Sequence, residues 1–287
     1  MPAREAMRRR NKHTPDGFEM EREKMLKSSE LAICKSINID QSIHDIQLNW
    51  LSGDIRVLPS VDELIHVIQY ADAWFSKRRL MQVNIRGDTL SIVDGRKRRG
   101  LVGINIGRTT LEIHLPARVF DRILLNSIGG QLRLNQLLAT RCQCRITSGH
   151  VDLSGRMEEL ELFAVASVVK GQHLSAEKLN LQSSSAKLDI SGEFSHLQMT
   201  TTGRELNMDC LKMPQSMHSV STGTKAVVSI PDNEGFRILL KRRSGALKSE
   251  FDLTPLHGNS NDLIHKSGNS EFQVDIRGGA FHLKSRK

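Results

Sequence analysis

Two cysteines one residue apart are the first side chains in this sequence whose spacing suggests chemistry. Cys142 and Cys144 share one face if the segment is a strand, because strand side chains alternate with a period of two. Such a pair could bind a soft metal ion or undergo thiol oxidation. The remaining cysteines, Cys34 and Cys210, form no second pair to complete a tetrahedral zinc site. The pattern is typical of small buried side chains, and we expect neither a metal ion nor a cofactor.

Carboxylates at one position of a recurring motif raise the question of a carbohydrate-active enzyme. Such enzymes need clustered acids, often with calcium, on one face of the fold. The position is occupied in turn by Arg56, Arg133, Asp152, a slot near Gly171, Asp189 and Asn207. Because the column mixes charges and skips one repeat between the two aspartates, it is typical of a solvated face. We therefore predict a protein that is not an enzyme and has no catalytic residues, and keep the carbohydrate-active enzyme as the alternative.

Four of the 11 histidines recur at nearly constant intervals, as stacked metal ligands would. They are His150, His173, His196 and His218, spaced by 22 or 23 positions. A metal site needs ligands that converge. Measured from the small residues of the repeat described below, these histidines fall at different places, so we expect no metal site from them.

Basic runs give the chain a net charge of +9, which favours anionic partners such as nucleic acid, acidic lipid or a teichoic-type polymer. The runs lie at residues 8–12, 96–99, 241–243 and 284–287. Arg96, Lys97, Arg98 and Arg99 follow the turn signal Asp94-Gly95, so we expect them to project as a loop and to form the main candidate binding site. A plain solvated loop is the other interpretation. Nucleic acid is the less favoured partner, because the sequence has no helix-turn-helix, zinc finger or aromatic stacking platform.

Aromatic side chains make up only 4% of the sequence, which limits carbohydrate binding through exposed rings. Trp50 lies on an alternating apolar face and is predicted to be part of the core. Tyr70 and Trp74 lie in a less regular segment, residues 69–75, which we expect to form a cap or an exposed patch. These two residues are the second candidate binding site.

The elements that position these residues change character near residue 36. Residues 1–35 lack strand alternation, and we expect a disordered basic tail followed by a short helix up to Glu30. From Ile37 the pattern alternates with a period of two, which predicts short strands in a domain over residues 36–287. The sequence contains neither 18 consecutive apolar residues nor a signal-like segment. We therefore expect a cytoplasmic protein, with peripheral membrane contact as an open alternative.

An internal repeat organises this domain. Its unit is a small residue, a variable residue and then an apolar–polar–apolar triplet, as at residues 52–57, 129–134, 148–153 and 185–190. From Gly130 the small residues advance by 19, 19, 18, 17, 20, 22 and 22 positions, with a degraded copy at Ser167-Val168 and a one-residue slip at Gly203 and Gly223. Short strands cannot bury an apolar face alone, so each coil of about 20 residues must be covered by the next. This predicts an all-β solenoid, with a β-sandwich as the competing fold.

The residues that carry a family resemblance are Asn49 to Ile55, the Ser/Thr-Gly coils from Gly130 to Gly223, and Phe272 to Gly279. They resemble the putative-adhesin family of bacterial β-strand-repeat proteins, a domain of unknown function of Firmicutes type. The resemblance implies a single-stranded right-handed β-helix and no established catalytic residues. Some relatives are membrane-anchored and belong to envelope-stress operons, whereas this sequence shows no anchor.

The function that we predict is that of a non-enzymatic structural or interaction β-solenoid with a long basic surface. Its expected partner is an unknown protein or an anionic polymer of the bacterial cell envelope, with peripheral membrane contact as a further possibility. Self-association is a second expectation, because exposed coil ends can add strands from other molecules. A carbohydrate-active or polyanion-binding protein on the same scaffold stays the alternative.

Overall fold

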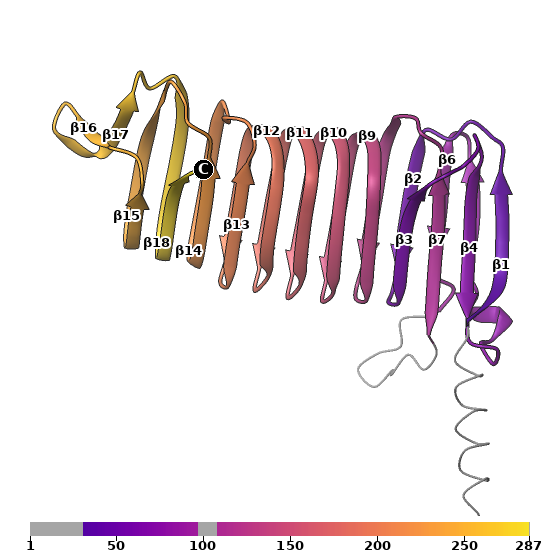
Figure 1. Cartoon of the computed structure of the whole chain (residues 1–287). Coiled ribbons are helices and arrows are strands. Elements are labelled where there is room, and N and C mark those ends of the chain that lie inside the picture. Colours follow the sequence, from indigo (N-terminus) through magenta and orange to yellow (C-terminus); the bar gives the residue numbers. More distant parts are fainter. Residues whose placement is uncertain (1–30, 97–107, 287) are drawn as a thin grey trace, which may run out of the picture.

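The computed structural model describes residues 31–96 and 108–286, and these residues are almost entirely β-structure (Figure 1). Within these ranges one 18-stranded sheet winds along the molecule, and one short 3-10 helix, η1 (Lys77–Arg79), lies in a connection between two strands. No helix in the described ranges has the length and apolar character to cross a bilayer. The strands are β1 (Ala32–Ile39), β2 (Asp45–Trp50), β3 (Asp54–Pro59), β4 (Ile65–Ala71), β5 (Gln82–Arg86), β6 (Thr89–Val93), β7 (Thr109–Leu115), β8 (Phe120–Ser127), β9 (Gln131–Thr147), β10 (His150–Val165), β11 (Val168–Ser184), β12 (Lys187–Thr202), β13 (Glu205–Cys210), β14 (Ser216–Ile230), β15 (Gly235–Ser249), β16 (Thr254–Leu256), β17 (Asn259–Lys266) and β18 (Ser270–Ser285).

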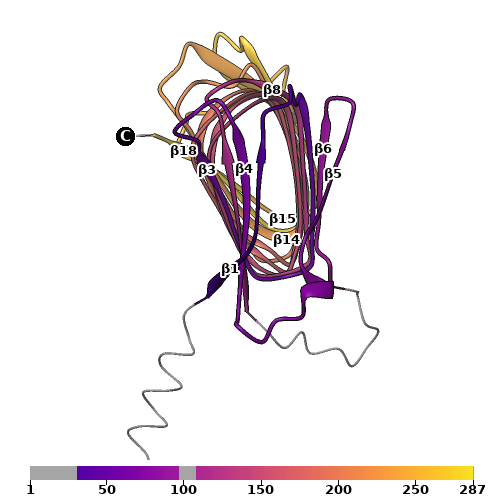
Figure 2. The ribbon, with the colours of Figure 1, turned by 90° about the vertical axis from the view of Figure 1, so that its right-hand side faces the viewer.

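Strands β9 to β12 form the regular middle of the molecule, where each coil lies on the next (Figure 1), and Figure 2 shows the coils superimposed in a view along the stack. They pair in parallel, whereas neighbouring strands of a β-sandwich pair antiparallel. The apolar residue of each repeat falls in register, and every member of the resulting column is at most 2% exposed. The column is Ile55, Leu132, Val151, Val169, Leu188 and Leu206. Coil-on-coil burial of this kind is the reason that short alternating strands fold here, and the predicted stacking is confirmed for this region.

One corner of most coils carries a small residue, because the backbones approach closely there. A Cβ atom at Gly130 would lie 2.0 Å from the carbonyl oxygen of Gly53, and one at Gly149 would lie 2.6 Å from that of Gly130. The next two coils place Ser167 and Ala186 in line with these glycines, because His150 pairs with Val168 and Val168 with Lys187. The small residue of the degraded copy is therefore Ser167.

The one-residue slip at Gly203 and Gly223 has a backbone origin. Immediately before this close-packed position, five successive coils have a residue in the left-handed region, with φ between 48° and 66°. Gly203 and Gly223 occupy this left-handed position, where glycine carries no steric penalty, and not the close-packed position after it. The members of this column are Ser148, Ala166, Ser185, Gly203 and Gly223.

The N-terminal end departs from the order of the sequence. Strand β3 pairs with β9, with Asp54 opposite Gln131, although 77 positions separate them. On its other side β3 pairs with β7, and β2 lies in the same way between β6 and β8. The coil formed by β2 and β3 is thus inserted between later coils. The expectation that each coil is covered by the next one along the chain is wrong here. A coil buries its apolar side chains equally well against a coil that is distant in the sequence.

The C-terminal end shows a second insertion. Strand β18 pairs in parallel with β14 on one side and with β15 on the other, so the last strand lies between two earlier ones. The small residues Gly245 and Gly268, which the repeat placed in successive coils, are therefore out of spatial order. A hairpin of β16 and β17 follows β15 with antiparallel pairing.

Antiparallel strands also close the N-terminal end, where β1 pairs with β4 and β5 pairs with β6. Strand β1 begins at Ala32, so it crosses the predicted boundary between the N-terminal segment (residues 1–35) and the β-domain (residues 36–287). The division into these two parts stays a prediction. The predicted tail and helix up to Glu30 lie outside the described residues.

Candidate functional site

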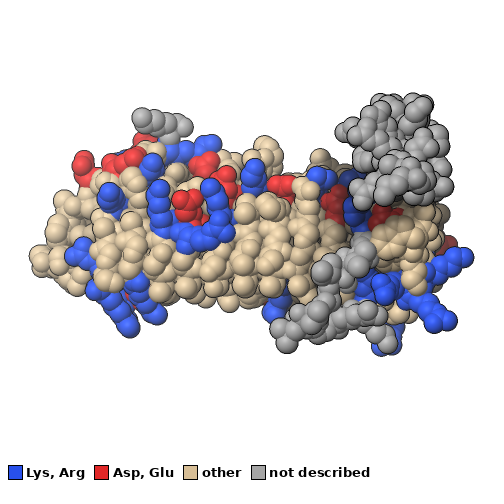
Figure 3. Space-filling view, turned by 90° about the horizontal axis from the view of Figure 1, so that it is seen from below, with Lys and Arg blue, Asp and Glu red and all other residues tan. Residues whose placement is uncertain are grey.

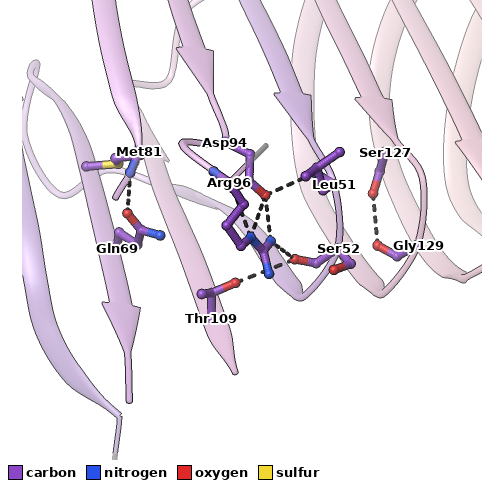
Figure 4. A network of polar contacts seen from close by, with 9 residues as sticks. All are labelled: Leu51, Ser52, Gln69, Met81, Asp94, Arg96, Thr109, Ser127 and Gly129. Atoms are coloured by element: carbon purple, nitrogen blue, oxygen red, sulfur yellow. Dashed lines mark hydrogen bonds and ion pairs between the residues drawn. The ribbon is translucent and has the colours of Figure 1, made fainter. Parts of the chain in front are cut away.

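The first candidate site begins with an arginine that points into the protein. Arg96 is 7% exposed, and its Nε donates to Asp94 Oδ1 at 2.9 Å and to Oδ2 at 3.0 Å. Its Nη2 also donates to Asp94 Oδ2 at 2.5 Å and to the carbonyl oxygen of Ser52, and its guanidinium lies 5.9 Å from the Trp50 ring centroid (Figure 4). The same carboxylate accepts a hydrogen bond from the Leu51 amide at 3.1 Å. Arg96 is therefore a structural residue that ties the end of β6 to the β2–β3 turn.

This placement corrects the prediction that Arg96 projects as a docking side chain. The turn signal at Asp94-Gly95 is real, but the aspartate two residues before Arg96 captures its guanidinium and turns it inward. Gly95 permits the tight approach, since a Cβ there would lie 1.9 Å from the carbonyl oxygen of Leu80. Lys97, Arg98 and Arg99 lie outside the described residues, and their binding role stays a prediction.

The two aromatic candidates have different surroundings. Tyr70 on β4 is half-buried, and its hydroxyl donates to Glu112 Oε2 at 3.1 Å. Burial, followed by the nearby Glu112 carboxylate, raises the pKa of Tyr70. Trp74 lies in the turn after β4 and is 62% exposed. The expected exposed patch thus has Trp74 as its surface member, whereas Tyr70 belongs to a polar network with Glu112 and Arg56.

A column of alternating charge follows the outer face of the middle coils. Strand pairing places Arg133 beside Asp152, Asp152 beside Lys170, and Lys170 beside Asp189. Lys170 fills the slot that the sequence analysis assigned to Gly171, because β10 and β11 pair one residue earlier than the motif suggested. Neighbouring parallel strands lie about 4.8 Å apart, so each aspartate faces a cation on at least one side. Lys170 therefore separates Asp152 from Asp189, and each aspartate is next to a positively charged side chain.

A cluster of exposed cations lies near the C-terminal end. It consists of Lys241, Arg242 and Arg243 on β15 and Arg277 on β18, and we call these four residues the C-terminal basic cluster. All three β15 members are exposed. In Figure 3, lysine and arginine side chains encircle an acidic patch in the half of the stack that holds the C-terminal strands.

One carboxylate lies within the C-terminal basic cluster. Asp275 is 9% exposed, pairs across the sheet with Lys241, and accepts a hydrogen bond from Arg277 Nη2 at 2.7 Å. This hydrogen bond, opposed by burial and helped by the charges of Arg277, Lys241 and Arg243, lowers the pKa of Asp275. Three of the four cations thus act on a single carboxylate that stays ionised, and the group as a whole is positive.

The C-terminal basic cluster was visible in the sequence only in part. Three consecutive cations at 241–243 interrupt the alternation of β15, and this interruption is the signal that could have identified them. Arg277 joins them because β18 is inserted beside β15, with Arg277 opposite Ser244. No pattern in the sequence predicts that β18 is inserted beside β15.

The paired cysteines behave as small core side chains, as predicted. Cys142 lies between Ile123 and Leu160 in adjacent coils, and Cys144 is fully buried two residues on. Burial raises the pKa of Cys142 to about 12, so the thiol is protonated and a poor metal ligand at neutral pH. Within the described part of the chain, no three histidine, cysteine or acidic side chains converge as metal ligands would.

Comparison with known proteins places this architecture among bacterial proteins. Residues 43–279 match the model of the family described as Toastrack DUF4097. A putative adhesin from Parabacteroides distasonis ATCC 8503 has a TM-score of 0.51 and 13% identity, covering 88% of this chain and 97% of that chain. This likeness concerns the fold alone.

Two further solved structures are similar at lower scores. A putative adhesin from Parabacteroides merdae ATCC 43184 has a TM-score of 0.49 and 13% identity, covering 89% of this chain and 97% of that chain. A putative lipid binding protein from Parabacteroides distasonis ATCC 8503 has a TM-score of 0.39 and 10% identity, covering 87% and 96%. No curated protein matches the chain.

Proposed function

The chain belongs to the Toastrack DUF4097 family, in agreement with the resemblance of its repeats to putative adhesins, and from that premise we propose a non-enzymatic interaction protein that docks on an anionic surface. The C-terminal basic cluster is the observation that carries the proposal. Three of its cations lie near one ionised carboxylate, on β15 and β18, which pair in parallel with each other, and β18 also pairs in parallel with β14.

The scaffold of this protein, in the same proposal, is a single-stranded right-handed β-helix. Consecutive strands from β9 to β12 pair in parallel, and each enters the next coil through a short corner. Connections between parallel strands of one sheet are right-handed in about 98% of cases, because twisted strands pack back onto the sheet only with that hand. A stack of this kind presents side chains at fixed spacing along its length.

A binding function is favoured over carbohydrate cleavage by the placement of the carboxylates. Lys170 separates Asp152 from Asp189, and Asp54 and Glu112 form ion pairs with Arg56 at 2.8 and 3.1 Å. A glycosidase needs two carboxyl groups that flank one glycosidic bond, one of them with a raised pKa. The carboxylates of this stack form ion pairs or alternate with cations, an arrangement that stabilises the folded surface.

An anionic membrane leaflet is the partner that we propose for the C-terminal basic cluster, with peripheral and reversible attachment. Each lysine or arginine near such a surface contributes roughly 1 kcal/mol, so a group of this size is sufficient for weak binding. Salt would reverse the attachment, because the screening length falls from about 10 Å at 0.1 M to about 3 Å at 1 M. We place this attachment in a cytoplasmic protein. The same protein could bind an envelope polymer or a partner protein, or associate with itself end to end.

The test uses the full chain and sedimentation with vesicles of phosphatidylglycerol or, as the neutral control, phosphatidylcholine. The variant Lys241→Gln/Arg242→Gln/Arg243→Gln removes three cations from the cluster. The matched control is Lys77→Gln/Arg78→Gln/Arg79→Gln, because η1 carries the same exposed Lys-Arg-Arg tripeptide. A third variant neutralises Lys97, Arg98 and Arg99, the site predicted from the sequence.

We expect binding to anionic vesicles alone, reversed by salt, and roughly 100-fold weaker in the variant at 241–243, from about 1 kcal/mol per cation. The variant at 77–79 should bind almost as the parent does. Equal losses in both would mean that total charge drives binding, and would contradict a docking site. If the variant at 97–99 alone loses binding, the site lies at the N-terminal end.

A further inference from the structure

A groove of about 490 Å³ opens at the second corner of the coils, on the far side of the strands from the small-residue corner. Its wall is formed by the ends of β3 and β7, with Leu58, Pro59, Leu115 and Pro116 among its members. Leu138 on β9 adds a further half-buried apolar side chain. The lining is mainly apolar, and its volume lies within the range of roughly 300–1,000 Å³ that is usual for small-molecule sites.

Backbone irregularities create the hollow. Gln136 and His173 adopt left-handed conformations with φ of 53°, and the pairing of β10 with its neighbours shifts register between Leu153 and Gly155. A Cβ at Gly155 would lie 2.2 Å from the carbonyl oxygen of Leu137, so the coils touch here through backbone. Bulges of this type bend strands and re-aim side chains. The corner therefore recedes, and the strand ends of β3 and β7 enclose the space.

The charged members of the groove are all basic. Arg118 and Arg156 line it, and no aspartate or glutamate does so among the described residues. Arg118 is held in place, since its Nη2 donates to the carbonyl oxygen of Ile43 at 2.9 Å and its guanidinium lies 5.2 Å from the Phe120 ring centroid. Its Nε is buried and has no acceptor within the described ranges. Neither arginine forms an ion pair with a carboxylate of the described residues, so their charges face the groove uncompensated.

We propose that this groove binds an anionic amphiphile, namely a long-chain carboxylate, with its alkyl chain along the apolar wall and its carboxylate at Arg156 and Arg118. The apolar wall needs a hydrocarbon occupant, because such surface gains free energy when it leaves water. The arginines need an anion, and a guanidinium matches the geometry of a carboxylate with two parallel hydrogen bonds. A neutral lipid would leave the charges unpaired, and a short carboxylate would leave the wall exposed.

The experiment is a calorimetric titration of the full chain with sodium dodecanoate below its micelle-forming concentration. Butanoate tests the need for the chain, 1-dodecanol tests the need for the charge, and dodecyltrimethylammonium tests its sign. Arg156→Gln removes an exposed cation, and Leu138→Gln makes the apolar wall polar. Arg145→Gln is the matched control, because Arg145 is an exposed arginine on β9 that lies over Phe163 and outside the groove.

We expect saturable binding of one dodecanoate per chain, weakened about tenfold or more by Arg156→Gln, as for loss of one charged contact. Leu138→Gln should weaken it as well, whereas Arg145→Gln should not. The absence of saturable binding, equal effects of the Arg156 and Arg145 variants, or equal affinity for 1-dodecanol would each overturn the proposal. The variant neutralised at 241–243 should bind dodecanoate normally, so the outcome is independent of vesicle docking.

Discussion

Two Asp-x-Arg pairs at opposite ends of the molecule share a spacing and differ in surroundings. Asp94 and Arg96 lie at the N-terminal end, with side chains 2% and 5% exposed. Asp275 and Arg277 lie at the C-terminal end, with side chains 12% and 41% exposed. The first pair joins two segments of the interior, whereas the second forms part of a basic surface. The Asp-x-Arg spacing brings the two charges into an ion pair. The position of the pair in the stack determines whether it stabilises the interior or contributes to a charged surface.

The largest expected effect is the loss of stability on Arg96→Ala. Removing one partner of a buried, hydrogen-bonded ion pair leaves an uncompensated charge and typically costs about 3–5 kcal/mol. Urea unfolding followed by circular dichroism would measure it. Asp94→Ala combined with Arg96→Ala is the control and should recover part of the loss. A cost for Arg96→Ala no greater than that for Arg277→Ala would break the comparison.

A third Asp-x-Arg pair supplies an intermediate case. Asp54 and Arg56 have side chains 23% and 39% exposed, and Arg56 also pairs with Glu112 at 3.1 Å. We expect Arg56→Ala to reduce stability by about 1–2 kcal/mol, because hydrogen bonds to charged groups are worth about that much when partly solvated. The same urea assay checks it. A loss as large as that of Arg96→Ala would show that exposure does not rank the three pairs.

The smallest effect concerns the pH dependence of stability at Asp275. Its pKa is lowered in the folded protein, chiefly by the hydrogen bond from Arg277, so the contribution is present above the unfolded value of about 3.9 and is lost as the pH falls through the folded pKa. The stability difference between the parent and Arg277→Ala should therefore be constant near neutral pH and shrink under acid conditions. Unfolding curves at several pH values would measure it, and a difference unchanged by pH would contradict the assignment.

Sequence reasoning was most successful where interactions are local or repeat regularly. The alternating apolar face around Trp50 predicted a buried side chain, and Trp50 is 2% exposed. The small residues at Gly130 and Gly149 predicted corners, and the close backbone contacts there explain them. The first success rests on strand alternation, which neighbouring residues determine, and the second on the regular stacking of the repeat.

Errors arose where distant segments meet. Arg96 was expected on the surface because a turn signal predicts a loop but not the direction of each side chain. The Gly171 slot is Lys170 because His150 pairs with Val168, which places Ser167 and not Val168 beside Gly149, and the pattern cannot show this register before the pairing is known. The groove escaped prediction, and only the run at 241–243 of the C-terminal basic cluster was visible, since each site joins segments that lie far apart in the sequence.

The sequence by itself determined an all-β stack with small residues at its corners, a buried apolar column and buried cysteines, because period-two alternation and a repeat of about 20 residues leave few other ways to bury apolar surface. Only the tertiary structure decided which coil covers which. Backbone pairing is nearly indifferent to sequence distance, so β2–β3 and β18 could insert between other coils, and those insertions bring Arg96 to Ser52 and Arg277 to the cations of β15.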